Sequence, residues 1–133
     1  AYCMEGELVA KFGIKICELE TSKVYLFKEQ SHPGRCIVAH KKHVGDMNEL
    51  TAEERAAYFE DVARVARAIM KAFNPDKVNY GAYGDTGHHL HFHLCPKYKD
   101  EYEWGGVFLM NPDKKYLTDE EYAAMIEKIK ANL

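Results

Sequence analysis

Short apolar runs near the start of the chain predict β-strands. The runs at residues 16–20 and 23–27 are separated by a Thr-Ser pair, which is the pattern of a β-hairpin. A third apolar run, at residues 35–39, follows a Pro-Gly turn and predicts a buried strand. The first forty residues are therefore expected to contribute three strands to a sheet.

Two capping boxes predict helices further along the chain. Thr51 and Glu54 open a helix that is expected to reach about Phe73, where an Asn-Pro pair ends it. Its apolar residues recur at three- and four-residue spacing and form one core-facing stripe: Tyr58, Val62, Val65, Ile69 and Phe73. Thr118 and Glu121 open a C-terminal helix that runs through further apolar positions: Tyr122, Met125, Ile126 and Ile129.

Three histidines alternate with apolar residues in the second half of the chain. His89, His91 and His93 are separated by single apolar residues, so one face of this strand is expected to be apolar and the other to carry imidazoles. A preceding strand is expected at residues 77–83, with a four-residue connection at residues 84–87. This connection is short enough for a hairpin, so the two strands should pair antiparallel.

These elements together predict the fold class. About five strands and two helices, mostly joined by hairpins, indicate an α+β fold. We expect a mainly antiparallel sheet of about five strands, with one long helix and a C-terminal helix. The chain has 133 residues, of which 47% are hydrophobic and 29% charged, so it can bury a core without disulfides or metals. A single domain over residues 1–133 is expected.

Composition and charge exclude several classes of partner. The net charge of -3 argues against a general affinity for nucleic acid. No apolar run approaches the roughly 18 residues of a membrane helix, and the first residues lack the basic and apolar regions of a signal peptide. The four cysteines stand singly, at Cys3, Cys17, Cys36 and Cys95, which favours free thiols in a reducing cytosol. A cytoplasmic protein without membrane or nucleic-acid partners is expected.

A single metal ion is a poor match for the histidine row. Alternate residues on a strand lie about 6.6 Å apart, which places the backbones of His89 and His93 about 13 Å apart. Zinc requires ligand nitrogens about 2 Å from the ion, so a straight strand cannot bring all three rings to it. Further ligands would have to come from His40, His43 or a cysteine, and the sequence has no CxxC pair. No metal site is predicted, and a metal-binding β protein that uses His89 and His91 stays as an alternative.

A row of imidazoles is better suited to a phosphoanhydride, because the charge of that group is also spread over several ångströms. A neutral imidazole is a competent nucleophile toward phosphorus, and protonated neighbours can donate hydrogen bonds to phosphate oxygens. His91 has a histidine on either side and is the natural nucleophile. Gly84 and Gly87 would let backbone N–H groups approach a phosphate closely, although a plain turn explains them equally well.

The order of these residues resembles the histidine triad (HIT) superfamily. The signature of that family is three histidines separated by single apolar residues and followed by two more apolar residues, and it is complete from His89 to Cys95. A Pro-Lys pair follows, where many members have Pro-Arg. The Pro-Gly turn before a buried strand, a Lys-Lys-His segment, the capped helix and Asn79 also recur in the family's order.

The resemblance implies an activity. HIT proteins are typically homodimers that bind nucleotides and act at the α-phosphate of nucleoside polyphosphates, dinucleoside polyphosphates or nucleoside phosphoramidates. The histidine that matches His91 attacks phosphorus and forms a nucleotidyl-histidine intermediate, which then releases a nucleoside monophosphate. No cofactor is implied, although a polyphosphate substrate can carry Mg²⁺. The alternative within this family is a nucleotide-binding regulatory or interaction module with little turnover.

The resemblance also implies roles for individual residues. The residues that match His89 and His93 position the nucleophile and contact phosphate or the leaving group. Asn79 matches an amide that touches the α-phosphate, and Thr86 matches a hydroxyl residue used for phosphate or leaving-group contact in some branches. Gly87 belongs to the same loop as Thr86, and its backbone is expected to approach the phosphate.

Three positions are assigned less directly from the same resemblance. Arg35 stands where several branches have a histidine, and it is expected to meet phosphate. The residue that binds the ribose is usually an Asp or Asn near the end of the second hairpin strand. A straight count places Phe27 there, whereas a two-residue gap brings Glu29 into register, so Glu29 is our choice for ribose with Phe27 beside it.

Overall fold

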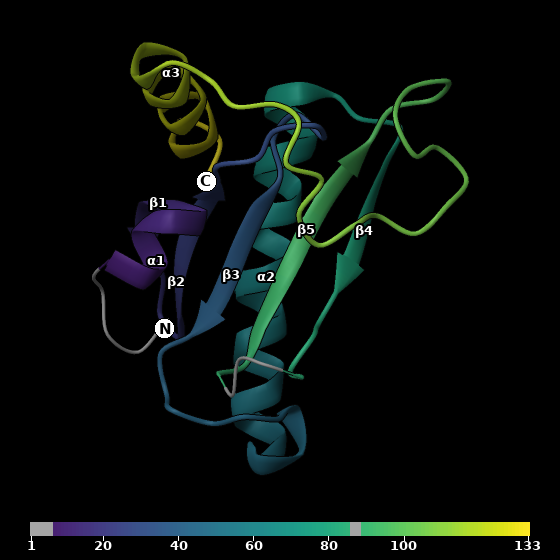
Figure 1. Cartoon of the computed structure of the whole chain (residues 1–133). Helices are drawn as coiled ribbons and strands as arrows, with labels where there is room; N and C mark the ends of the chain where they lie inside the picture. Colours follow the sequence, from purple (N-terminus) through teal and green to yellow (C-terminus); the bar gives the residue numbers. More distant parts are fainter. Residues whose placement is uncertain (1–6, 86–88) are drawn as a thin grey trace.

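The computed structural model describes residues 7–85 and 89–133 and contains one antiparallel sheet of five strands. The strand order across the sheet is β1-β2-β3-β5-β4, and every neighbouring pair is antiparallel. The strands, in that order, are β1 (Gly13–Glu18), β2 (Ser22–Phe27), β3 (Cys36–His40), β5 (His91–Lys97) and β4 (Lys77–Gly81). The expected α+β fold with a five-stranded antiparallel sheet is confirmed (Figure 1).

Local hydrogen bonds fix the ends of the two main helices. They are α2 (Ala52–Phe73) and α3 (Asp119–Lys130), and each begins with a complete capping box, at Thr51 and Thr118 respectively. Asn74 closes α2 in the left-handed conformation, with φ 52°. Both predicted helices are confirmed. The structure adds two short elements that the sequence pattern did not indicate, the helix α1 (Glu7–Phe12) and the 3-10 helix η1 (Met47–Glu49).

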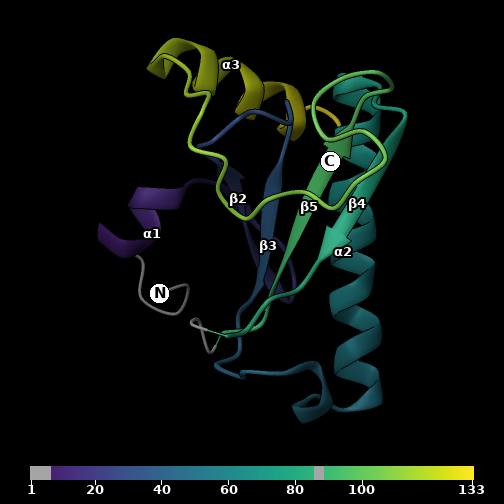
Figure 2. The same cartoon turned by 45° about the vertical axis from the view of Figure 1, so that its right-hand side comes forward.

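The two faces of the sheet are covered by different parts of the chain. Helix α2 lies along one face, while the segment that joins β5 to α3, residues 98–117, crosses the opposite face (Figures 1 and 2). We call residues 98–117 the connecting segment. The core between the sheet and α2 consists of buried apolar side chains from both: Val24, Leu26, Val38, Leu94, Tyr58, Val62, Val65 and Ile69. The histidine row is therefore expected on the face away from α2.

The strands around the histidine row are shorter than predicted. Strand β4 ends at Gly81 and does not reach Tyr83, and β5 begins at His91 and not at His89. Just before β5, Leu90 is bonded to the end of β3 and to the loop that follows it. The carbonyl of Leu90 accepts the N–H of His40 at 3.0 Å, and the N–H of Leu90 donates to a carbonyl in the loop after β3 at 2.8 Å. The predicted antiparallel pairing of the two strands is confirmed.

The structure also bears on the thiols and on membrane insertion. The three cysteines in the described part of the chain, Cys17, Cys36 and Cys95, are free thiols, as predicted, and Cys3 lies outside that part. Among the helices that the structure describes, none is long and apolar enough to cross a membrane.

Candidate active site

The alternation of residues along β5 separates imidazoles from apolar side chains. His91 and His93 pair with Ala39 and Ile37 of β3, on the sheet face opposite α2, and their ring centroids are 5.4 Å apart. Phe92 points to the other face, where its ring lies 6.0 Å from that of Tyr58 on α2. The prediction of an imidazole face is confirmed for His91 and His93.

His89 precedes the strand and supports His91 through the backbone. Its ring contacts the carbonyl of His40 through Nε2, and lies 5.7 Å from the ring of His43. The carbonyl of His89 lies 2.8 Å from Nδ1 of His91. Because a carbonyl can only accept, Nδ1 of His91 carries the ring proton and donates it. The neutral ring of His91 therefore has its lone pair on Nε2, the nitrogen that can attack an electrophile.

Burial keeps these imidazoles neutral. It lowers the pKa of His91, although the hydrogen bond to the His89 carbonyl opposes this, and it lowers the pKa of His89 in the same way. The pKa of His93 falls to about 3, because burial, the Arg35 charge and His91 all disfavour a second proton. Burial therefore favours the neutral form of His89 and His93 in the folded chain. Each neutral ring still has one N–H, and in His89 that N–H, on Nε2, already contacts the His40 carbonyl.

A hollow of about 250 Å³ lies beside the ring of His91. It is lined by His91 and Leu90, by residues 82–84, which follow β4, and by residues 45–47. Tyr83 and Gly84 form its wall on the β4 side. Two of the residues expected to bind phosphate, Thr86 and Gly87, lie outside the described residues. Gly84 is the part of that loop which the structure brings next to His91.

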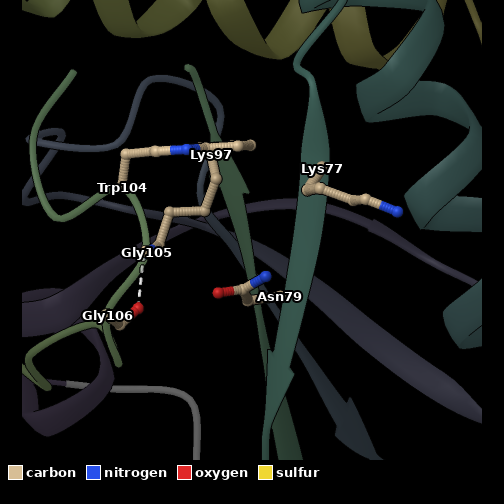
Figure 3. A pocket seen from close by; sticks show the side chains of 6 residues that line it. All are labelled: Lys77, Asn79, Lys97, Trp104, Gly105 and Gly106. Atoms are coloured by element: carbon tan, nitrogen blue, oxygen red, sulfur yellow. Dashed lines mark hydrogen bonds between the residues drawn. The ribbon is translucent and has the colours of Figure 1, made fainter. Parts of the chain in front are cut away.

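Asn79 lies on the same sheet face as the histidines. It pairs with Cys95, while Gly81, two residues further along β4, pairs with His93. In Figure 3 its amide is directed toward the connecting segment, whereas the side chain of Lys77 points away. Asn79 lines a second hollow, which has a volume of about 340 Å³. Its lining residues are Lys77, Asn79, Lys97, Trp104, Gly105 and Gly106. Asn79 thus shares the sheet face of the histidines but lines a different hollow from the one beside His91.

Arg35 does not face a space that a phosphate could enter. Its side chain is 0% exposed, and its NH1 and NH2 groups donate to the carbonyls of Leu109 and Met110 at 3.0 and 2.8 Å. NH2 also lies 3.0 Å from Nδ1 of His93. The structure does not support the expected direct contact with phosphate, because the guanidinium is buried and its NH1 and NH2 groups are bonded to the connecting segment and to His93.

Phe27 lies against the histidine row, whereas Glu29 does not. The Phe27 ring meets that of His93 edge to face at 5.4 Å. The buried carboxylate of Glu29 accepts the N–H and hydroxyl of Ser31 and the backbone N–H groups of Lys114 and Lys115, all at 2.7 to 2.9 Å. Glu29 therefore anchors the connecting segment, and the structure gives no support to its assignment to ribose.

Replacing Glu29 by alanine is expected to loosen the connecting segment. The variant leaves the N–H groups of Lys114 and Lys115 without their acceptor, at a cost of about 1–3 kcal/mol. We expect faster amide hydrogen exchange at these two residues and a lower free energy of unfolding. The conservative variant Glu29→Gln keeps one acceptor oxygen and should lose less. Unchanged exchange at both amides in Glu29→Ala would contradict this role.

Acid should weaken the same anchor. Burial alone would raise the pKa of Glu29, but the hydrogen bonds from Ser31 and from the backbone of Lys115 and Lys114 outweigh it, so the pKa is lowered. A lowered pKa in the folded state means that this stabilisation is present above the unfolded pKa and is lost as the pH falls through the folded value. The acid-induced loss of stability should therefore be smaller in Glu29→Gln than in the wild type.

Two aromatic residues at the site were missed by sequence reasoning. The rings of Tyr83 and Phe108 each lie 6.3 Å from that of His93, and they meet each other at 90°. They pack over Gly81, where an added Cβ would stand 2.7 Å from Tyr83 and 2.8 Å from Phe108. A glycine inside a strand is a signal of such a close approach. Nothing in the local sequence indicates that the connecting segment brings Phe108 against Gly81 and His93.

Comparison with known proteins gives consistent matches. The HIT domain family model matches residues 13–100. The adenosine 5'-monophosphoramidase hnt1 of Schizosaccharomyces pombe is 28% identical over an alignment of 127 residues, and this alignment covers 90% of this chain and 88% of that protein. Protein hit of Bacillus subtilis is 30% identical over an alignment of 123 residues, which covers 84% of this chain and 85% of that protein. A histidine triad protein from Sinorhizobium meliloti has the same fold, with a TM-score of 0.89 at 24% identity over 98% of this chain and 96% of that chain.

Proposed function

Since the HIT domain match spans residues 13–100, this chain belongs to the HIT family, and we propose that it hydrolyses or transfers nucleotides at the α-phosphate through a nucleotidyl-His91 intermediate. The observation that carries the proposal is the state of His91. Its Nδ1–H donates to the His89 carbonyl at 2.8 Å, its pKa is lowered by burial, and it borders a hollow. A neutral imidazole with its lone pair on Nε2 is what attack on phosphorus requires.

The proposed reaction has two displacements. In the first, Nε2 of His91 bonds to the α-phosphorus and the bond from phosphorus to the leaving oxygen or nitrogen breaks. The leaving group departs with the bonding pair and takes up a proton from solvent. In the second, the oxygen of water or of another acceptor bonds to phosphorus and the phosphorus–nitrogen bond breaks. The proton of the attacking water or acceptor passes to solvent. The products are a nucleoside monophosphate, or its ester with the acceptor, and His91 in its original state.

Donors around His91 would stabilise the charge on the phosphate oxygens. The neutral ring of His93 has one N–H to offer, and Asn79 has an amide on the same sheet face. The hydroxyl of Thr86 and the backbone of Gly84 and Gly87 would contribute from the loop before the triad. Mg²⁺, where present, would arrive with a polyphosphate substrate.

The leaving group distinguishes the candidate substrates. The printed name of the S. pombe relative, an adenosine 5'-monophosphoramidase, supports a nucleoside phosphoramidate, in which the leaving atom is nitrogen. The direct test is incubation of the protein with an adenosine phosphoramidate, a dinucleoside polyphosphate and a nucleoside diphosphate sugar, with chromatographic detection of the nucleoside monophosphate. Release from at least one of them is expected. Tight nucleotide binding with no release from any would favour a regulatory module instead.

We also propose that the protein is a homodimer. Among the described strands β4 pairs only with β5, so its other edge offers backbone groups to a further strand. Tyr80 on β4 is 53% exposed. Light scattering should give twice the 15.3 kDa of one chain, and the mass of one chain at micromolar concentration would contradict the proposal.

A further inference from the structure

We propose that Arg35 is a positioning residue that holds His93 in the tautomer with its proton on Nε2, so that His93 is a hydrogen-bond donor beside the nucleophile His91. The role of His93 as a donor to the substrate rests on the proposed function. The tautomer itself can be measured without turnover.

The position of Arg35 is fixed from several sides. Its guanidinium carbon lies 4.2 Å from the centre of the Phe27 ring and 4.9 Å from that of the Phe108 ring. Two carbonyls of the connecting segment, at Leu109 and Met110, accept from its NH1 and NH2 groups. A planar group held between rings and carbonyls has no freedom to turn toward a ligand.

The chemistry of the guanidinium decides the tautomer of its neighbour. All hydrogen-bonding groups of arginine are donors, and NH2 of Arg35 lies 3.0 Å from Nδ1 of His93. Nδ1 must therefore be the acceptor, and the single proton of the neutral ring must be on Nε2. The pKa of His93, about 3, agrees with a ring that stays neutral at neutral pH.

His91 and His93 consequently have opposite roles in hydrogen bonding. His91 donates from Nδ1 to the His89 carbonyl and has its lone pair on Nε2, whereas His93 accepts at Nδ1 and carries its proton on Nε2. Their ring centroids are 5.4 Å apart. A substrate phosphate held by this pair would meet a nucleophile at one ring and a donor at the next, which can bind a phosphate oxygen or the leaving atom.

The contacts of Arg35 also couple the connecting segment to the site. The same NH2 group that bonds to His93 donates to Met110, which is 75 residues away in the chain. Displacing residues 109 and 110 would therefore remove two of the contacts that hold the guanidinium. His93 would then lose the neighbour that fixes its tautomer. The connecting segment acts on His93 through Arg35 and needs no contact with the substrate.

The test is nitrogen NMR of the histidine side chains in the full-length protein at neutral pH. Wild-type His93 should show a protonated Nε2 and an unprotonated Nδ1. Arg35→Met should give a mixture of tautomers and a raised pKa for His93, with kcat reduced by about tenfold or more and KM less affected. Arg35→Lys, whose ammonium is also only a donor, should restore the tautomer. The exposed Arg67→Met on α2 is the matched control and should change none of these.

Each outcome decides the proposal. A proton on Nδ1 of wild-type His93 overturns it, and this measurement does not depend on whether Arg35→Met folds. An unchanged tautomer in a folded Arg35→Met also overturns it. The predicted tautomer without turnover of any nucleotide would overturn the proposed function and leave the positioning role of Arg35 intact.

Discussion

Replacing His91 by alanine is expected to abolish formation of the covalent nucleotidyl-enzyme and to reduce turnover by at least about a thousandfold. The reason is that the hydrogen bond from Nδ1 to the His89 carbonyl leaves the Nε2 lone pair of His91 as the nucleophile. Alanine at this position removes the atom that bonds to phosphorus. His93 cannot replace it, because Arg35 holds its proton on Nε2, and a protonated ring nitrogen has no lone pair to donate.

Rapid quenching with a nucleotide labelled in its α-phosphate measures this directly. Wild-type protein should retain acid-labile label, and His91→Ala should retain none. His43→Ala is a suitable control, because it also removes an imidazole near the row but from an exposed position next to His89, and it should still be labelled. Equal labelling of wild type and His91→Ala would remove the assignment of the nucleophile.

Replacing Asp61 by alanine is expected to lower the free energy of unfolding by about 2–4 kcal/mol. Asp61 is a buried carboxylate on the sheet-facing side of α2. Its Oδ2 accepts the N–H and the hydroxyl of Thr21 at 2.9 and 2.7 Å, and the hydroxyl of Ser22 at 2.8 Å. These contacts attach the turn between β1 and β2 to the helix. Alanine would leave three donors without their acceptor.

Urea denaturation of three variants separates this effect from a general effect of charge. Asp61→Ala should unfold at a clearly lower urea concentration than the wild type. Asp61→Asn keeps one acceptor oxygen and should lose less. Glu60→Ala removes a carboxylate from the adjacent, exposed position on α2 and should stay within about 0.5 kcal/mol of the wild type. If Asp61→Ala and Glu60→Ala unfolded at the same urea concentration, the hydrogen bonds from the turn to Asp61 would contribute nothing to stability.

The elements that the sequence predicted well depend on neighbours along the chain. The capping boxes at Thr51 and Thr118 join residues three apart, and both helices begin where these residues predict. The alternation along β5 places His91 and His93 on one face because successive strand residues point to opposite sides. The place of His91 on the sheet could therefore be predicted from the sequence, and its proposed role as nucleophile came from the resemblance to the HIT family.

The assignments that the structure does not support concern residues whose partners lie far away in the chain. Arg35 was expected at a phosphate, but its guanidinium is bonded to His93, 58 residues away, and to two carbonyls of the connecting segment. Glu29 was expected at a ribose, but its carboxylate accepts from the backbone 85 and 86 residues further on. Neither local pattern contains a sign of these partners.

By itself the sequence predicted the five strands, the two main helices and the shared face of His91 and His93, and its resemblance to the HIT family indicated His91 as the residue to propose as nucleophile. Only the tertiary structure decided which ring nitrogen of each histidine holds its proton and which charged side chains are buried under the connecting segment. The physical reason is that capping and alternation arise within a few residues, where the chain itself fixes the distance. A buried guanidinium or carboxylate instead bonds to whatever donors and acceptors the folded chain brings to it, and those come from segments that meet only when the sheet and residues 98–117 pack together.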